Sequence, residues 1–189
     1  GKTFGRDAEL FPADVCPCCQ LTAHVDDEQR LWIGSRQVDG KFRDATVAMS
    51  TDGGRTFSAR QRVAANRWEI EGCPLKPTGI AARGRNVWAT YFSGAENPAG
   101  VYLSRSTDGG KSWSAPMLVH PGATTSDAPV IGLAGSTLHL FWHAKVGDAG
   151  GRRVYTRAST DGGASFGPIV ELPAPAGARR RATWPSWPT

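Results

Sequence analysis

The sequence has no apolar run that approaches the roughly 18–20 residues of a membrane-spanning helix, and no segment follows a convincing helical period. It has no basic helix and no nucleic-acid-binding motif, although its formal net charge is +5 and its pI is about 9.3. We therefore expect no membrane span and no nucleic-acid partner. The modest basic excess can steer an anionic ligand, but a soluble protein with surplus arginine is the simpler interpretation.

Cysteine is also scarce, with only 4 residues in 189. Three of them stand together in Cys16-Pro17-Cys18-Cys19, and the fourth is Cys73. An even number of cysteines is compatible with disulfides in an oxidising compartment. Their density in one short stretch makes them candidates for a disulfide or for a metal site.

What the chain does contain is one octapeptide in three copies, at Ser50–Phe57 (STDGGRTF), Ser106–Trp113 (STDGGKSW) and Ser159–Phe166 (STDGGASF). The first four residues, Gly1-Lys2-Thr3-Phe4, match the second half of the motif in phase. The second glycines are therefore spaced by 53, 56 and 53 residues. A period of this length indicates a repeat architecture.

Each copy has the chemistry of a tight turn. The two glycines allow a positive φ, the aspartate can accept hydrogen bonds from nearby backbone N–H groups, and the final aromatic ring can pack beneath the turn. The residues that we expect to have this structural role are Asp52, Gly54, Phe57, Asp108, Gly110, Trp113, Asp161, Gly163 and Phe166.

The pattern S-x-D-x-G-x-x-[F/W] resembles the Asp-box (BNR repeat) of sialidases and related β-propellers. This resemblance implies an all-β fold, a β-propeller of four-stranded antiparallel blades. It also implies that each box joins the two outer strands of a blade, on the face opposite the active site. The boxes therefore indicate the fold and mark the face where function is not expected.

A second repeated mark is a proline before an apolar segment, at Pro17, Pro74, Pro129 and Pro185, with steps of 57, 55 and 56 residues. We interpret each proline as the start of a blade's innermost strand, where proline is tolerated. The predicted organisation of 1–189 as part of a single propeller is a partial blade over 1–14, blades at about 15–71, 72–126 and 127–182, and the start of a further blade over 183–189. Propellers close with about 4–8 blades, so we expect the rest of the ring from missing blades or from another copy of the chain.

Hydrophobic alternation predicts three more strands in each period. The second strands are predicted at 30–36, 86–92 and 137–143, the third at 46–49, 101–105 and 154–158, and the fourth at 61–64, 117–120 and 169–172.

Propeller geometry places the loops before the innermost strands, and those between second and third strands, on the ligand-facing rim. The residues expected there are Arg36, Glu71, Lys76, His120 and His143. Asp127 is a weak candidate for a catalytic acid, although a turn-capping role is the better interpretation. A sialidase also needs three arginines, a Tyr nucleophile with a Glu partner, and an Asp acid/base, and none of the family's arginine motifs is matched here.

The cysteines Cys16, Cys18, Cys19 and Cys73 leave alternatives open. The favoured interpretation is a disulfide between Cys73 and one of the first three, which would join neighbouring blades. The second is a copper or zinc site, completed by His120 or His143, and the third is a set of free or redox-active thiols. The segments also resemble a group of bacterial secreted Asp-box proteins with C-x-C-C and G-C-P stretches, which implies a periplasmic or secreted, extracytoplasmic location.

Three function classes follow. The first is a glycan-related protein, which if catalytic would be a sialidase-like glycoside hydrolase and which would take a glycan or another anionic ligand. The second is a metal-binding or redox protein that uses the cysteines. The third is an interaction scaffold with structural disulfides alone.

Overall fold

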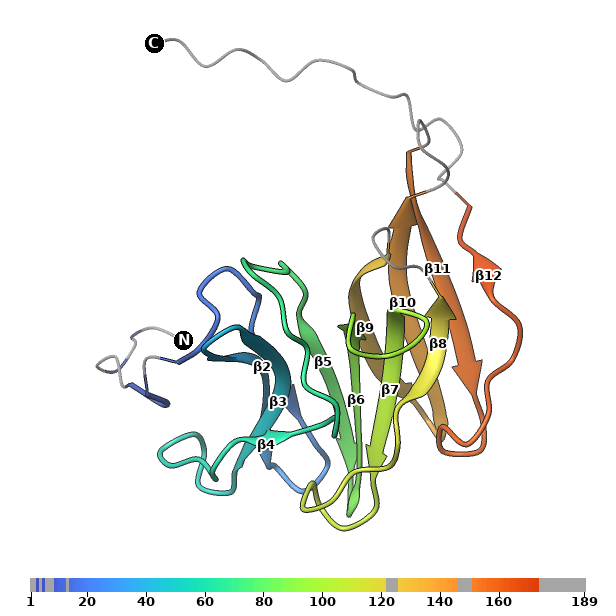
Figure 1. Cartoon of the computed structure of the whole chain (residues 1–189). Coiled ribbons are helices and arrows are strands. Elements are labelled where there is room, and N and C mark those ends of the chain that lie inside the picture. Colours follow the sequence, from blue (N-terminus) through green and yellow to red (C-terminus); the bar gives the residue numbers. More distant parts are fainter. Residues whose placement is uncertain are drawn as a thin grey trace, which may run out of the picture.

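The structure is a computed structural model that describes residues 3, 5, 9–12, 14–121, 126–145 and 151–173, with the backbone alone for 126–128. All regular secondary structure within these residues is β-strand (Figure 1). The strands are β1 (Thr22–Val25), β2 (Leu31–Asp39), β3 (Phe42–Ser50), β4 (Gln61–Arg62), β5 (Thr78–Arg83), β6 (Asn86–Ser93), β7 (Gly100–Ser106), β8 (Met117–Pro121), β9 (Ser126–Ala134), β10 (Thr137–Lys145), β11 (Arg152–Ser159) and β12 (Val170–Glu171). A search of the described residues finds no helix long and apolar enough to cross a membrane.

The strands form three four-stranded antiparallel sheets, each a simple meander in chain order. The first sheet is β1 to β4, the second is β5 to β8 and the third is β9 to β12. Figure 1 shows the three sheets side by side, with the first and third at opposite ends. The predicted all-β fold with four-stranded antiparallel sheets is therefore confirmed.

The three repeated prolines that the structure describes do not start the innermost strands, so the prediction is wrong for them, and Pro185 lies outside the described residues. Pro17 and Pro74 lie in loops, and the strands that follow them begin only at Thr22 and Thr78, whereas Pro129 lies inside β9. Around Pro17 the chain makes a turn in which the N–H of Cys19 donates to the carbonyl of Cys16 at 3.3 Å. In the first two repeats the proline thus marks a loop that precedes the sheet, because a residue without an N–H fits a turn as well as a strand start.

Two apolar cores lie between the sheets. The first core contains Trp32 and Val47 from the first sheet and Val87 and Tyr91 from the second. The second core joins the second sheet to the third, and its largest buried members are Trp88, Leu103, Leu138, Leu140 and Trp142. Each sheet therefore buries a face against its neighbour, and burial of apolar surface is what holds adjacent sheets together.

The three octapeptides form the same hydrogen-bonded turn between the third and fourth strands. In the first copy, Asp52 Oδ1 accepts from the N–H groups of Arg55 (3.0 Å) and Thr56 (2.9 Å), and Asp52 Oδ2 accepts from the Thr56 hydroxyl (2.6 Å). The Ser50 hydroxyl donates to Asp52 at 2.8 Å and accepts from the N–H of Gly54. The equivalent bonds recur around Asp108 and Asp161.

In the second and third boxes, the second glycine also contacts the preceding sheet. Gly110 has a φ of +82°, and a Cβ on it would lie 3.2 Å from the ring of Trp32. Gly163 has the same φ, and a Cβ there would lie 3.1 Å from Leu103 and 3.3 Å from Trp88. The indole N–H of Trp88 donates to the carbonyl of Gly162 at 2.8 Å. The box therefore receives a tryptophan of the neighbouring sheet in addition to making a turn.

Candidate functional site

The strand register separates the two ends of every sheet. In the third sheet, Leu138 pairs with Ser159 beside the Asp-box, and Lys145 pairs with Arg152 at the other end. We call the end with the Asp-box turns the box end and the opposite one the loop end. Arg36, Lys76, His120 and His143 all lie toward the loop end, and that this end faces a ligand stays a prediction.

Three basic side chains gather at the loop end between the second and third sheets. Lys76 comes from the loop before β5, His143 from β10, and Arg152 from the first position of β11. The guanidinium of Arg152 lies 3.1 Å from Nδ1 of His143. Lys76 and Arg152 are close enough that each contributes to the electrostatic environment of His143. We call these residues the basic cluster.

Burial and repulsion between cations lower the pKa values of His143 and Lys76 in this cluster. Burial, together with the nearby cations Arg152 and Lys76, lowers the pKa of His143 below its ordinary value. A neutral imidazole can accept at Nδ1 from Arg152 and present an N–H at Nε2. Burial, with Arg152 and Arg36 nearby, lowers the pKa of Lys76 to about 8. The cluster is therefore positively charged at neutral pH. A bound anion would stabilise it by reducing the repulsion between its cationic side chains.

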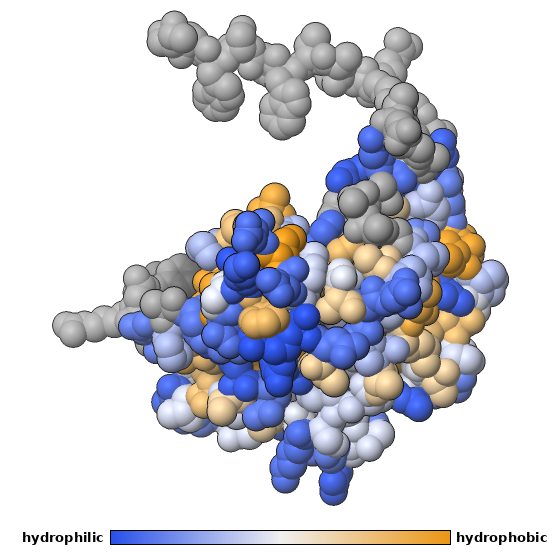
Figure 2. All heavy atoms as spheres, viewed as in Figure 1, coloured by the Kyte–Doolittle hydropathy of each residue, from blue (hydrophilic) through white to orange (hydrophobic). Residues whose placement is uncertain are grey.

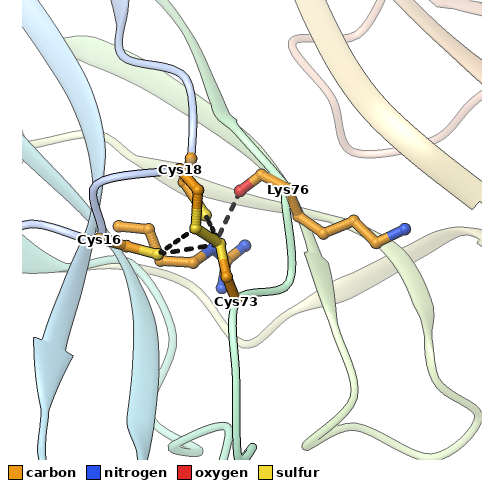
Figure 3. The surroundings of a disulfide bond; sticks show 6 residues. Cys16, Cys18, Cys73 and Lys76 are labelled. Atoms are coloured by element: carbon orange, nitrogen blue, oxygen red, sulfur yellow. Dashed lines mark hydrogen bonds between the residues drawn. A yellow bond between two sulfur atoms is a disulfide. The ribbon is translucent and has the colours of Figure 1, made fainter.

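The Lys76 side chain packs against its neighbours although its ammonium group is charged. The residue is 9% exposed, and its ammonium lies 4.6 Å from the centroid of the Phe92 ring. Figure 3 shows the side chain extending from its backbone away from the cysteines. The preceding residue, Leu75, has a φ of 54°, in the left-handed region that a leucine seldom adopts. Strained backbone of this kind is characteristic of positions that aim a side chain at a site.

Arg36 lies at the loop end but is 2% exposed. Its guanidinium donates to the backbone carbonyls of Lys76 (3.0 Å), Arg43 (2.6 Å) and Phe92 (3.0 Å). Burial lowers its pKa to about 10, and the thiols of Cys19 and Cys16 are near enough to oppose that shift. In this arrangement Arg36 joins the first sheet to the second, with its donors used inside the protein.

The other predicted rim residues are more scattered. Glu71 is exposed and pairs with Lys41 at 3.3 Å. The His120 ring stacks on that of Tyr155 and packs at a tilt against that of Trp142, with ring centroids 5.9 and 5.2 Å away, and burial and Arg157 lower its pKa. Asp127 pairs with His143 along the backbone, and its side chain lies outside the described part of the structure.

Figure 3 shows Cys16, Cys18 and Cys73 beside Lys76, where the loops before β1 and β5 converge, and the Sγ of Cys19 lies 4.0 Å from that of Cys73. Cys18 and Cys73 form a disulfide with a Cα–Cα distance of 6.6 Å, as the favoured interpretation of the sequence predicted. Cys16 and Cys19 are free and buried. The Sγ of Cys16 lies 3.5 Å from that of Cys73 and 3.8 Å from that of Cys18. The loop end therefore carries the basic cluster and a compact group of sulfurs close together.

Sequence reasoning missed Arg152. A signal was present, because Arg152 stands at the start of the third strand, across from the end of the strand that carries His143. An antiparallel register that pairs Leu138 with Ser159 carries Arg152 to the same end of the sheet. The approach of Lys76 from the neighbouring sheet has no local signal, since it depends on how the two sheets pack.

Comparison with known proteins supports the fold. The family model for the BNR/Asp-box repeat matches residues 104–115, the second octapeptide and its flanks. No curated protein matches the chain. An α-L-arabinanase from Penicillium chrysogenum, solved with arabinobiose, is similar over 85% of this chain and 52% of its own, with 18% identity and a TM-score of 0.62.

An α-L-arabinofuranosidase from Fusarium graminearum, solved with an iminosugar inhibitor, is similar over 81% of this chain and 48% of its own, with 15% identity and a TM-score of 0.57. The chain thus spans about half the length of these structures. Likeness at this identity concerns the fold alone. Together with the repeat match, it confirms the resemblance to Asp-box β-propellers that the octapeptide predicted.

Proposed function

We propose that this chain is part of an extracytoplasmic, glycan-related Asp-box propeller, and that its loop end binds an anionic carbohydrate at the basic cluster. The single observation that supports this proposal most strongly is the convergence of Lys76, His143 and Arg152 from three elements at the end opposite the boxes. Structures of similar fold are an arabinanase with arabinobiose and an arabinofuranosidase, both proteins that act on carbohydrates.

The chemistry of the cluster favours a carboxylate or sulfate on the sugar. An arginine fork can bind a carboxylate with two parallel hydrogen bonds, and a partly desolvated ammonium gains more from a negative charge than one in water. Tyr91 and Tyr102 do not offer a nucleophile here, since both are buried and donate or share hydrogen bonds with Ser104 and with the carbonyl of Pro98. The proposal is therefore one of binding.

The rest of the propeller is the partner that the third sheet requires. Figure 2 shows apolar side chains exposed along the outer edge, where Figure 1 places β11 and β12. The exposed apolar residues of these two strands and of the segments beside β12 are Val154, Ile169, Val170 and Leu172. Each of the first two sheets buries such residues against a following sheet, so we expect a further blade to cover this face.

The experiment is a binding titration of the purified protein with two anionic probes, sialyllactose and trigalacturonate, and with lactose as the neutral control. We expect both anionic sugars to bind at least about tenfold more tightly than lactose, because a well-placed charged hydrogen bond is worth about 1.5–3 kcal/mol. Lys76→Met should remove most of that preference. Binding should also weaken above about pH 8, where Lys76 loses its proton, and this pH dependence should vanish in the variant.

Lys111→Met is the matched control, because Lys111 is an exposed lysine inside the second Asp-box. It removes the same charge from the box end, and we expect unchanged affinity. Equal binding of lactose and of the anionic sugars would overturn the proposal, as would an equal effect of the two lysine substitutions or no binding at all.

A further inference from the structure

The sulfur atoms of Cys16, Cys18 and Cys73 lie close to the spacing of a tetrahedral metal site, and that of Cys19 lies beside them. In such a site with Zn–S bonds of about 2.3 Å, neighbouring sulfurs are about 3.8 Å apart. The Sγ atom of Cys16 is 3.8 Å from that of Cys18 and 3.5 Å from that of Cys73. The Sγ atom of Cys19 is 4.0 Å from that of Cys73. To form such a site, the bonded pair Cys18–Cys73 would have to separate, and the Cys19 sulfur would have to move closer to the group of Cys16, Cys18 and Cys73.

The donor set is made of sulfur alone. Among the described residues, the one group able to supply three or more metal ligands within 4.8 Å is Cys16, Cys18 and Cys73, and Cys19 lies next to it. The structure does not add His120 or His143 to this group, although the sequence suggested that either could complete it. Four thiolates in tetrahedral arrangement are typical of structural zinc.

A buried cation lies beside the sulfurs. The Arg36 guanidinium is held by three carbonyl oxygens, which carry no formal charge, and Cys19 and Cys16 lie near enough to act on it electrostatically. Asp44 is also near, but its carboxylate accepts from Arg67 at 2.9 Å and from the N–H of Trp68. A zinc ion with four thiolates has a net charge of −2, so Arg36 is placed to compensate an anionic centre.

Solvent access differs between the two pairs of cysteines. Cys18 and Cys73, which form the disulfide, belong to exposed residues, whereas Cys16 and Cys19 are 2% and 6% exposed. A small dithiol can therefore reach the disulfide from solvent. We propose that reduction of the Cys18–Cys73 disulfide converts the four cysteines into a site for a single Zn(II) ion.

The reaction balances without any other reagent. A dithiol reductant supplies two electrons and two protons, the Cys18–Cys73 bond becomes two thiols, and the reductant leaves as its own disulfide. Zn(II) then replaces the four thiol protons, which are released to solvent. Both states join the loop before β1 to the loop before β5, so the first and second sheets remain linked under oxidising conditions by the disulfide and under reducing conditions by the metal.

The experiment compares oxidised and reduced wild-type protein. Each is incubated anaerobically with Zn(II), desalted and analysed for bound zinc by mass spectrometry, with circular dichroism to follow the β-sheet. We expect about one zinc ion in each reduced chain and less than about a tenth of that in the oxidised chain. Co(II) in place of Zn(II) should give thiolate-to-cobalt charge-transfer absorption with tetrahedral d–d bands.

Cys16→Ser and Cys19→Ser are the decisive variants, because each leaves the Cys18–Cys73 disulfide intact for folding. After reduction, each should bind zinc at least about tenfold more weakly than the wild type. Alkylation of the reduced wild type should abolish binding. Reduced wild type that folds and binds no zinc would overturn the proposal, as would loss of the β-sheet that zinc does not restore, or variants that bind as well as the wild type.

Discussion

At the scale of single residues, Asp26 shows how much one carboxylate can organise. It is 4% exposed and lies in the turn between β1 and β2. It accepts from the N–H groups of Glu28 (3.0 Å) and Arg30 (2.9 Å), from Arg30 Nε (2.7 Å) and from the indole N–H of Trp32 (2.9 Å). The same Trp32 contacts Gly110 of the next sheet, so Asp26 fixes a side chain on which two sheets depend.

Asp26→Asn is expected to destabilise the protein by about 3 kcal/mol, because an amide nitrogen cannot accept from Arg30 or Trp32 and leaves buried donors unpaired. Burial alone would raise the pKa of Asp26, but the bonds from Trp32 and Arg30 hold it below its ordinary value. Its contribution is therefore full above the unfolded pKa of about 3.9 and is lost as the pH falls further. Denaturant unfolding at pH 7 and at pH 3 measures both effects.

The control for that change is Asp27→Asn, because Asp27 is the exposed neighbour in the same turn. It should shift the free energy of unfolding by less than about 0.5 kcal/mol. A cost for Asp26→Asn that is equally small, or that grows as the pH falls, would contradict this account of the turn.

At the scale of elements, the Asp-box has two roles that can be separated. Gly162 and Gly163 both have a positive φ, of +69° and +82°, so alanine is strained at either position. A Cβ on Gly162 meets nothing within 4 Å, whereas one on Gly163 meets Leu103, Leu138 and Trp88 at 3.1–3.3 Å. A substitution at the first glycine therefore tests the turn alone. A substitution at the second tests the turn together with the contact between sheets.

Gly163→Ala is expected to destabilise the protein by about 1–2 kcal/mol more than Gly162→Ala, since its Cβ must displace the core of the neighbouring sheet. The measurement is the difference between their free energies of unfolding in denaturant, with the shared backbone strain cancelled by the comparison. Equal costs would mean that the box is a turn alone.

The sequence predicted the second strands well and the innermost strands poorly, and both outcomes have a physical reason. The second strands were expected from Arg30, Asn86 and Thr137 and begin at Leu31, Asn86 and Thr137, because alternating apolar residues on a half-buried strand leave a clear local pattern. The starts of the innermost strands were predicted at the wrong residues, because the sequence around a proline in a loop before a strand resembles that around a proline within a strand. The burial of Arg36 and the approach of Lys76 to Arg152 depend on packing between sheets, which no local pattern encodes.

At the scale of the whole molecule, chemistry and architecture divide between the two ends of the sheets. The box end carries three turns built from the same hydrogen bonds, and hydrogen bonds from their own hydroxyl and N–H groups hold the pKa values of Asp52, Asp108 and Asp161 well below the usual range. These aspartates are occupied within the turns. The loop end carries the basic cluster and the cysteines, which come from different sheets and are brought together only by the fold.

Hydrogen–deuterium exchange with and without trigalacturonate tests most directly whether a ligand binds at the loop end. The account predicts slower exchange in peptides that cover 72–78, 143–145 and 152–154, with no change in the three box segments 50–57, 106–113 and 159–166. Protection of the box segments without protection of the loop end would contradict it.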